Sequence, residues 1–156
     1  DAVIANATYH WREHASSLLS REFMEQVKAH LNPGGIYLFN ATGSDRAAKT
    51  ALEVFPDCAL LLNNILASNA PLSYDKDRWR KTLTAYNYDG KPLFDSNSSK
   101  DLEDLENIIS IIDNLGVREV ATEQRLWTRE LLEKDPGTRK ARPITDDNLG
   151  HEFWYH

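Results

Sequence analysis

The feature that most constrains this fold is a strand, a helix and a second strand in close succession. An apolar run at residues 2–5 is followed, after a polar stretch, by helical spacing of apolar residues over 17–31. The sequence Asn-Pro-Gly-Gly at 32–35 ends the helix, and residues 36–39 form a second apolar run. Gly and Pro favour helix ends, and short apolar runs of this kind are typical of strands buried on both faces. The sequence therefore predicts a βαβ unit with parallel strands and a right-handed crossover.

The next stretch predicts a second helix and an antiparallel hairpin. Ser44 or Asp45 stands where a helix cap is needed, and the helix would end near residue 54. Two short apolar runs follow at 58–62 and 65–68, and the Asn63-Asn64 pair favours a two-residue turn because Asn tolerates positive φ. The predicted fold class is α/β, with parallel strands plus an antiparallel hairpin.

Beyond residue 71 the pattern becomes mainly helical. Helical spacing covers 77–85, 101–115 and 119–134, with a loop at 87–92 and breaks at Gly116 and at residues 135–137. The middle helix is expected to turn its apolar side inward, with Leu102, Leu105, Ile108, Ile109 and Ile112. We therefore predict two parts, an α/β core over 1–71 and a mainly helical C-terminal extension over 72–156.

Composition narrows the class of function. The chain has 156 residues and a formal net charge of −6, and an acidic surface repels phosphate backbones, so nucleic acid is excluded as a partner. Cys58 is the single cysteine, which excludes an internal disulfide and a Cys-based metal site and is compatible with the cytoplasm. No apolar run approaches the ~20 residues of a transmembrane helix, and no signal peptide is visible.

These segments resemble spermidine synthases, which have the class I methyltransferase fold. The residues that carry the resemblance are Asp-Ala-Val-Ile-Ala-Asn at 1–6, Leu18-Leu19, Glu22-Phe23 and Leu-Asn-Pro-Gly-Gly-Ile at 31–36. The resemblance covers residues 1–71 and implies the C-terminal half of a Rossmann-like, seven-stranded sheet with an antiparallel hairpin strand near one edge. Pro-Ile-Thr-Asp-Asp at 143–147 is similar to an element of bacterial spermidine-synthase-like proteins that carry membrane segments elsewhere in the chain.

The resemblance implies aminopropyl or methyl transfer to a small molecule. The intact protein would use S-adenosylmethionine or its decarboxylated form, held by a Gly-rich turn after the first strand. This chain lacks that motif, since its adjacent glycines Gly34 and Gly35 precede a strand. It also begins directly on an apolar run, without Met. We therefore expect a cytoplasmic domain fragment, on its own or at the cytoplasmic side of a membrane protein, that binds no cofactor and is inactive alone.

The resemblance also locates a candidate site after the first strand. Spermidine synthases place an Asp-x-x-Asp pair there, and the match puts its two positions on Asn6 and Tyr9, which carry no charge at neutral pH. His10 is the remaining candidate for a base. The candidate catalytic residues are Asn6, Tyr9 and His10. Ordinary polyamine synthesis is therefore not expected.

Neighbouring residues complete this candidate site. Arg12 can hold a carboxylate or phosphate in a fork and Trp11 can stack on a ring, so an acidic or neutral substrate suits the loop. The candidate substrate-binding residues are Thr8, Trp11, Arg12 and, after the second strand, Asn40. Asn6 and Ala7 are the candidate cofactor contacts. No metal is expected, because His10 and His14 form a metal pair only on a helix.

The sequence leaves several interpretations open. The replacement of the acid pair favours a binding or scaffold domain that retains the transferase fold, whereas His10 and Arg12 favour a working transferase. These loop residues can also be plain solvated side chains, and an unrelated α/β domain can share the βαβ pattern. The strand at 2–5 has an open edge, so we expect a homodimer formed by edge pairing or through the helices of 101–134.

Overall fold

The computed structural model of the protein describes residues 2–5, 15–41, 43–115 and 126–149. Contacts divide the chain into two compact units. The first unit is formed by Asp1–Leu72 together with Trp127–His156, and the second by Ser73–Leu126. The first boundary falls next to residue 71, where the sequence pattern changes, but the chain from Trp127 onward belongs to the first unit.

The first unit is built on a mixed sheet in which the described strands have the order β1-β2-β4-β3-β7. β1 (Ala2–Ala5) and β2 (Ile36–Asn40) are parallel. β4 (Asn64–Ser68) lies between β2 and β3 (Asp57–Leu61) and is antiparallel to both. β7 (Leu126–Thr128) is the last strand in the order. The predicted α/β class, with parallel strands and an antiparallel hairpin, is thus observed.

Two serine caps define the helices that connect these strands. A 3-10 helix (Ala15–Leu19) and α1 (Arg21–His30) join β1 to β2, and α2 (Asp45–Val54) follows β2. The Ser20 hydroxyl accepts a hydrogen bond from the Phe23 amide at 3.2 Å, so the predicted helix over 17–31 is divided at this residue. The Ser44 hydroxyl accepts from the Ala47 amide at 3.2 Å and caps α2.

The core of the first unit lies against one face of the sheet. Tyr37 and Phe39 on β2 are fully buried, and their rings stack with centroids 4.8 Å apart. The Tyr37 hydroxyl donates to the Leu18 carbonyl at 3.0 Å, which satisfies its polar atom inside the core. Their neighbours on β2 are only half-buried, and Ile4 on β1 is 67% exposed. The expectation that β1 is buried on both faces is therefore wrong, because Ile4, on the face opposite to Tyr37 and Phe39, is exposed.

The hairpin turn lies one residue earlier than the sequence predicts. Leu61 pairs with Asn64, so the turn consists of Leu62 and Asn63, with Leu62 at φ 57°. The cause is the neighbouring strand: Asn64 pairs with Asn40 of β2, and the Asn63 carbonyl accepts from the Ala41 amide at 2.7 Å. Asn64 is therefore already part of the ladder and is not free to turn.

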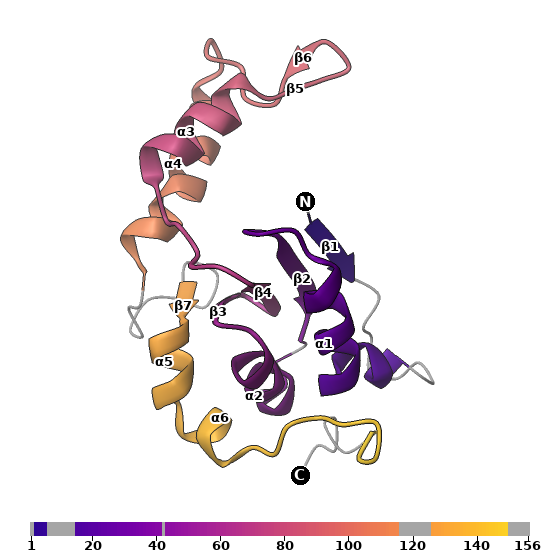
Figure 1. The fold of residues 1–156 in the computed structure, drawn as a ribbon. Helices are drawn as coiled ribbons and strands as arrows, with labels where there is room; N and C mark the ends of the chain where they lie inside the picture. The colour runs from indigo at the N-terminus through magenta and orange to yellow at the C-terminus, as the bar shows by residue number, and fades with distance from the viewer. Residues whose placement is uncertain (1, 6–14, 42, 116–125, 150–156) are drawn as a thin grey trace. The chain divides into compact units, whose positions relative to one another are not determined.

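The C-terminal segment differs most from expectation. The sequence predicts one helix over 119–134, but the described part of this stretch forms β7 and then α5 (Arg129–Lys134). A further short helix, α6 (Pro136–Lys140), follows it. Asp135, expected at a helix break, caps α6 by accepting from the Thr138 amide at 3.0 Å. After α6 the chain runs past α2 to α1, where the Arg21 amide donates to the Ile144 carbonyl at 2.8 Å (Figure 1). Burial of Leu132 and Ile144 in the core holds this segment on the first unit.

The second unit is a helical hairpin with a small β-ribbon. α3 (Lys76–Ala85) and α4 (Ser99–Asp113) are linked by the Lys76–Asp113 ion pair at 2.6 Å. Between them, the segment expected to be a loop pairs β5 (Asn87–Tyr88) with β6 (Lys91–Pro92) around a turn at positive φ. Of the apolar residues predicted to face inward on α4, Leu105 and Ile109 are buried, whereas Leu102 is 44% exposed. None of the described helices has the length and apolar character needed to cross a membrane.

Candidate functional site

Most residues of the sequence-predicted site lie outside the described part of the chain. These are Asn6, Ala7, Thr8, Tyr9, His10, Trp11 and Arg12. Asn40 is described and is the last residue of β2. β1 ends at Ala5, which is paired with Phe39. The chain therefore leaves β1 at the carboxyl end of the two parallel strands, where Asn40 also lies.

A cavity opens at this same end of the sheet, beside the carboxyl ends of β2 and β3. Its volume is about 170 Å³, and its lining combines aliphatic residues with other, mainly polar ones. The aliphatic lining residues are Ala41, Ala48, Leu60, Ile65 and Leu132, and the other lining residues, called the rim below, are Gly43, Ser44, Asp45, Trp127, Asp135 and Thr138. Ligands of open α/β sheets bind at the carboxyl ends of strands, so this is the candidate site.

Two carboxylates dominate the rim of the cavity. Asp45 is the first residue of α2, and Asp135 caps α6. A Cβ atom placed on Gly137 would lie 2.2 Å from Asp45 Oδ2 and 3.1 Å from Asp135 Oδ2. Both carboxylates therefore crowd around Gly137, and the absence of a side chain there lets Asp45 approach.

The neighbourhood changes the acidity of Asp45. Burial, and then the negative charge of Asp135, raise the pKa of the Asp45 carboxyl above its ordinary value. No hydrogen bond or ion pair joins its carboxylate to a cation within the described ranges. A carboxylate in this setting attracts a proton or a cationic group more strongly than an isolated one.

The other polar rim residues have structural roles as well. The Ser44 hydroxyl caps α2, and the amide of the buried Thr138 donates to Asp135. Trp127 is half-buried, packs against the core and supplies the aromatic ring of this lining. The indole face of a tryptophan attracts cations, as a carboxylate does, so the rim is suited to a basic group.

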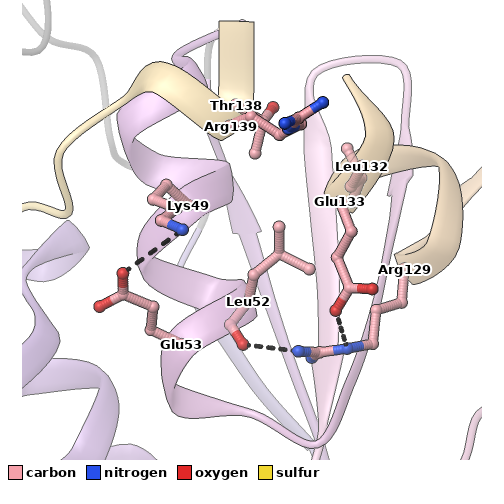
Figure 2. A pocket seen from close by; sticks show the side chains of 8 residues that line it. All are labelled: Lys49, Leu52, Glu53, Arg129, Leu132, Glu133, Thr138 and Arg139. Atoms are coloured by element: carbon pink, nitrogen blue, oxygen red, sulfur yellow. Dashed lines mark hydrogen bonds and ion pairs between the residues drawn. The ribbon is translucent and has the colours of Figure 1, made fainter. Parts of the chain in front are cut away.

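A second cavity, of about 230 Å³, lies between α2 and the α5–α6 segment, and its Arg129, Glu133, Lys49 and Glu53 side chains are paired (Figure 2). Arg129 donates to the Leu52 carbonyl at 2.9 Å and to the Phe55 carbonyl at 2.7 Å, and its Nε lies 2.7 Å from Glu133. Lys49 pairs with Glu53 at 3.6 Å. The bonds from Arg129 satisfy carbonyls at the C-terminal end of α2. The side chains that line this cavity therefore serve to cap the helix.

Other chemistry is weakly supported within the described ranges. Cys58 is buried, and burial raises the pKa of its thiol to about 12, which removes it as a nucleophile. Nowhere in that part of the chain do three His, Cys, Asp or Glu side chains gather as a metal-binding group. The cavity beside β2 and β3 therefore remains the strongest candidate.

Sequence reasoning missed this cavity because its rim comes from three separate segments. Ser44 and Asp45 were recognised only as caps, and Trp127 and Asp135 only as parts of a predicted helix and its break. The one signal available was the Asp-Pro-Gly sequence at 135–137, which marks a tight turn where a neighbouring segment can approach.

Comparison with known proteins does not assign a family. No protein-family model matches the chain, and no curated protein or solved structure matches it significantly. The function must therefore be inferred from the mixed α/β sheet and from the cavity beside β2 and β3.

Proposed function

We propose that this chain is the substrate-side part of a spermidine-synthase-like transferase. The intact protein would transfer an aminopropyl or methyl group from an S-adenosyl cofactor to a small molecule, and this chain alone would be inactive. The strand arrangement is the observation that carries the proposal. β4 lies between β2 and β3 and is antiparallel to both, whereas β1 and β2 are parallel, and the transferase fold likewise combines parallel strands with an antiparallel hairpin strand.

The cavity supports a small substrate. A water molecule occupies roughly 30 Å³ in the liquid, so a cavity of about 170 Å³ suits a ligand of only a few non-hydrogen atoms. Asp45 and Asp135 favour a basic amine at this position, whereas Arg12 in the loop after β1 led us to expect an acidic or neutral substrate. Because both carboxylates line the cavity, we propose a basic amine as the substrate group bound there.

The chemistry of these residues is consistent with transfer of an aminopropyl or methyl group to an amine. An amine nucleophile must lose a proton, and a carboxylate whose pKa is raised toward the working pH is a better acceptor for that proton. Asp45 meets this condition, because burial and Asp135 raise its pKa. We propose that Asp45 takes the proton and that Asp135 and Trp127 orient the amine.

The described residues around the candidate cavity offer little room for the cofactor itself. The cavity beside β2 and β3, at about 170 Å³, is smaller than the ~300–1,000 Å³ of ligand pockets. The sequence also lacks a Gly-rich turn after a strand. We therefore assign cofactor binding to a polypeptide segment other than this chain, and derive no step through the cofactor.

The proposal is tested by binding measurements on this chain. Calorimetry with S-adenosylmethionine and its decarboxylated form is expected to show no binding, and micromolar affinity would contradict the proposal. Putrescine, used as a diamine probe, is expected to shift the amide NMR signals of Ser44 and Thr138. Asp45→Asn should remove that shift. Asp75→Asn, which changes a helix cap in the second unit, should leave it unchanged.

The second candidate is a binding or scaffold domain without catalysis. The observation that favours it is the replacement of the expected acid pair by Asn6 and Tyr9. Expression of a longer polypeptide, translated with any coding sequence that precedes this chain, distinguishes the two candidate functions. Cofactor binding and turnover of an amine would support the transferase, whereas cofactor-free folding without turnover would support the scaffold.

A further inference from the structure

The cavity beside β2 and β3 has an apolar part that is built on the sheet. Leu60 on β3 lies directly opposite Ile65 on β4, and both residues line the cavity. Directly opposite residues of an antiparallel pair point to the same face of the sheet, so the two side chains form one continuous apolar surface. Neither side chain has a hydrogen-bonding group. A charged group of a ligand that lay against them would lose its water without gaining a partner.

The charge in the described lining is confined to two residues. Asp45 begins α2 and Asp135 caps α6, and the other described lining residues are uncharged. Both carboxylates reach the same place, because a Cβ atom on Gly137 would overlap Asp45 Oδ2 and lie 3.1 Å from Asp135 Oδ2. A single ammonium group can therefore contact both oxygens, since its bonds to carboxylates are about 2.7–2.9 Å long.

The volume of the cavity restricts the rest of the ligand to a short chain. The cavity measures about 170 Å³, and a water molecule takes up roughly 30 Å³ in the liquid, so on the order of five non-hydrogen atoms fit. With one ammonium group at the carboxylates, the remaining space suits a chain of about four carbons. The aliphatic residues of the lining are matched to such a chain.

We propose that this cavity selects primary monoamines with a short aliphatic chain and discriminates against diamines. The ammonium group binds between Asp45 and Asp135, and the alkyl chain lies along Leu60 and Ile65. This inference rests on the proposed function, because it names the class of amine that the same site accepts. It also agrees with the expectation from the sequence that ordinary polyamine synthesis is not the activity.

A diamine lacks a second anionic partner among the described lining residues. Its far ammonium group would lie beside Leu60 and Ile65, where an unpaired charge is unfavourable. Loss of the proton avoids this burial, but an amine with a pKa of ~10.4 is about a thousandfold more stable in its protonated form at neutral pH. A monoamine meets neither penalty, because its only charge is the one that the carboxylates bind.

NMR titration of the whole chain with n-butylamine and with putrescine at neutral pH compares the two classes of amine. The two probes have the same carbon chain and differ only in the second amino group. The amide signals of Ser44 and Thr138, which line the cavity, report binding. We expect n-butylamine to bind about tenfold more tightly than putrescine, or better. Equal affinities, or tighter binding of putrescine, overturn the proposal.

Leu60→Glu tests the placement of the alkyl chain. The new carboxylate provides a partner for a second ammonium group, so the affinity of putrescine relative to n-butylamine should rise by about tenfold. Leu61→Glu is the matched control. Leu61 is also half-buried on β3, but it points to the other face of the sheet and does not line the cavity, so the ratio should stay unchanged.

Circular dichroism checks the fold of both variants. A folded Leu60→Glu variant with an unchanged ratio of affinities contradicts the placement of the alkyl chain. If Leu60→Glu does not fold, the order of affinities in the unmodified chain still decides the proposal.

Failure of this inference and failure of the proposed function give different results. If putrescine binds more tightly than n-butylamine and Asp45→Asn removes that binding, the monoamine preference is wrong and the amine site stands. If neither amine binds at millimolar concentration, both proposals are wrong. If n-butylamine is preferred but this chain also binds S-adenosylmethionine with micromolar affinity, the monoamine site stands and the proposed division of the transferase is contradicted.

Discussion

Thr50 joins two segments that are distant in sequence through one hydroxyl group. Its Oγ1 donates to the Arg46 carbonyl at 2.8 Å and accepts from the Ile144 amide at 2.8 Å. Thr50 is fully buried, so neither bond can be replaced by water. The neighbouring Arg46 contributes a further bond, from its Nε to the Arg142 carbonyl at 3.1 Å. Together they fasten the C-terminal segment to α2.

Replacing Thr50 with valine keeps the shape and removes both bonds. The buried Ile144 amide then loses its acceptor, and we expect the free energy of unfolding to fall by about 1–3 kcal/mol. Urea denaturation measures this change. Thr84→Val is the control, because Thr84 makes a similar bond to the Arg80 carbonyl but is exposed, and its effect should be small. Equal effects of the two variants would contradict the role given to the Ile144 amide.

The Asp45–Asp135 pair makes a prediction about pH. A raised pKa means that the folded protein holds the Asp45 proton more tightly than the unfolded chain does. Ionisation of Asp45 therefore lowers the free energy of unfolding. This loss develops as the pH rises from 3.8, the ordinary pKa of an aspartate, through the higher pKa that Asp45 has in the folded protein. Asp135→Asn keeps a good helix cap and removes the neighbouring charge, so it should lower the pKa of Asp45.

Carboxyl ¹³C NMR titration measures the pKa of Asp45 in both proteins. The pH-dependent loss of stability should also shrink in Asp135→Asn. Asp75→Asn, a cap in the other unit, should leave the Asp45 titration unchanged. An unchanged or higher Asp45 pKa in Asp135→Asn would show that the two carboxylates are not coupled.

At this scale the sequence predicts local roles well and distant encounters poorly. The sequence predicts a cap at Ser44 or Asp45, because both stand directly before helical spacing, and in the structure Ser44 makes the capping bond. The approach of Asp45 to Asp135 depends on the chain returning over α2 ninety residues later, and no local pattern encodes this. The candidate residues of the loop after β1 lie outside the described part of the chain and stay predictions.

Among the secondary-structure elements, α2 is held at its C-terminal end by a residue from α5. Arg129 donates to the Leu52 and Phe55 carbonyls, which have no partner within the helix ladder. Arg129→Met should therefore lower the free energy of unfolding by about 1.5–3 kcal/mol, the range for hydrogen bonds to charged groups. Thermal and urea unfolding followed by circular dichroism measure the effect.

The control for Arg129 is Lys134→Met on the same helix. Among the described residues Lys134 pairs only with the exposed Glu130, and exposed pairs contribute little to stability. Little change is expected in this variant. A loss in Lys134→Met as large as in Arg129→Met would assign the effect to helix α5 itself instead of to the cap on α2.

The sequence predicts the existence of most elements in the first 71 residues because apolar period, caps and Gly-Pro breaks agree there. It fails at β7, where Leu126, Trp127 and Leu131 fit helical spacing equally well. β7 is a strand because of its place in the sheet beside β3, which is a non-local interaction. The hairpin turn was misplaced for a similar reason, since pairing of Asn64 with β2 moves the turn onto Leu62.

For the whole molecule, the division into two units predicts separate responses to core mutations. Ile144 is fully buried in the first unit, and Ile109 is fully buried in the second. Ile144→Ala should cost roughly 2–5 kcal/mol, the range for truncating a buried Ile, and reduce hydrogen-exchange protection in α1 and α2. Protection in α4 should stay unchanged.

Ile109→Ala is the reciprocal variant. It should reduce protection in α3 and α4 and leave the sheet of the first unit protected. Loss of protection in both units after either substitution would mean that they unfold as one cooperative body. The sequence predicted a boundary near residue 71, but not the return of the chain after residue 126, because the buried positions of Leu132 and Ile144 are fixed only by packing.

That return has a consequence for biosynthesis. A ribosome releases α3 and α4 long before it releases Ile144, so the local contacts of the helical hairpin can form first. The core of the first unit waits for Ile144, since the main-chain amide that bonds Thr50 is made 94 residues after Thr50 itself. Until then β1, β2 and β4 emerge as apolar strands without their full cover, and this interval is when the nascent protein most needs a chaperone.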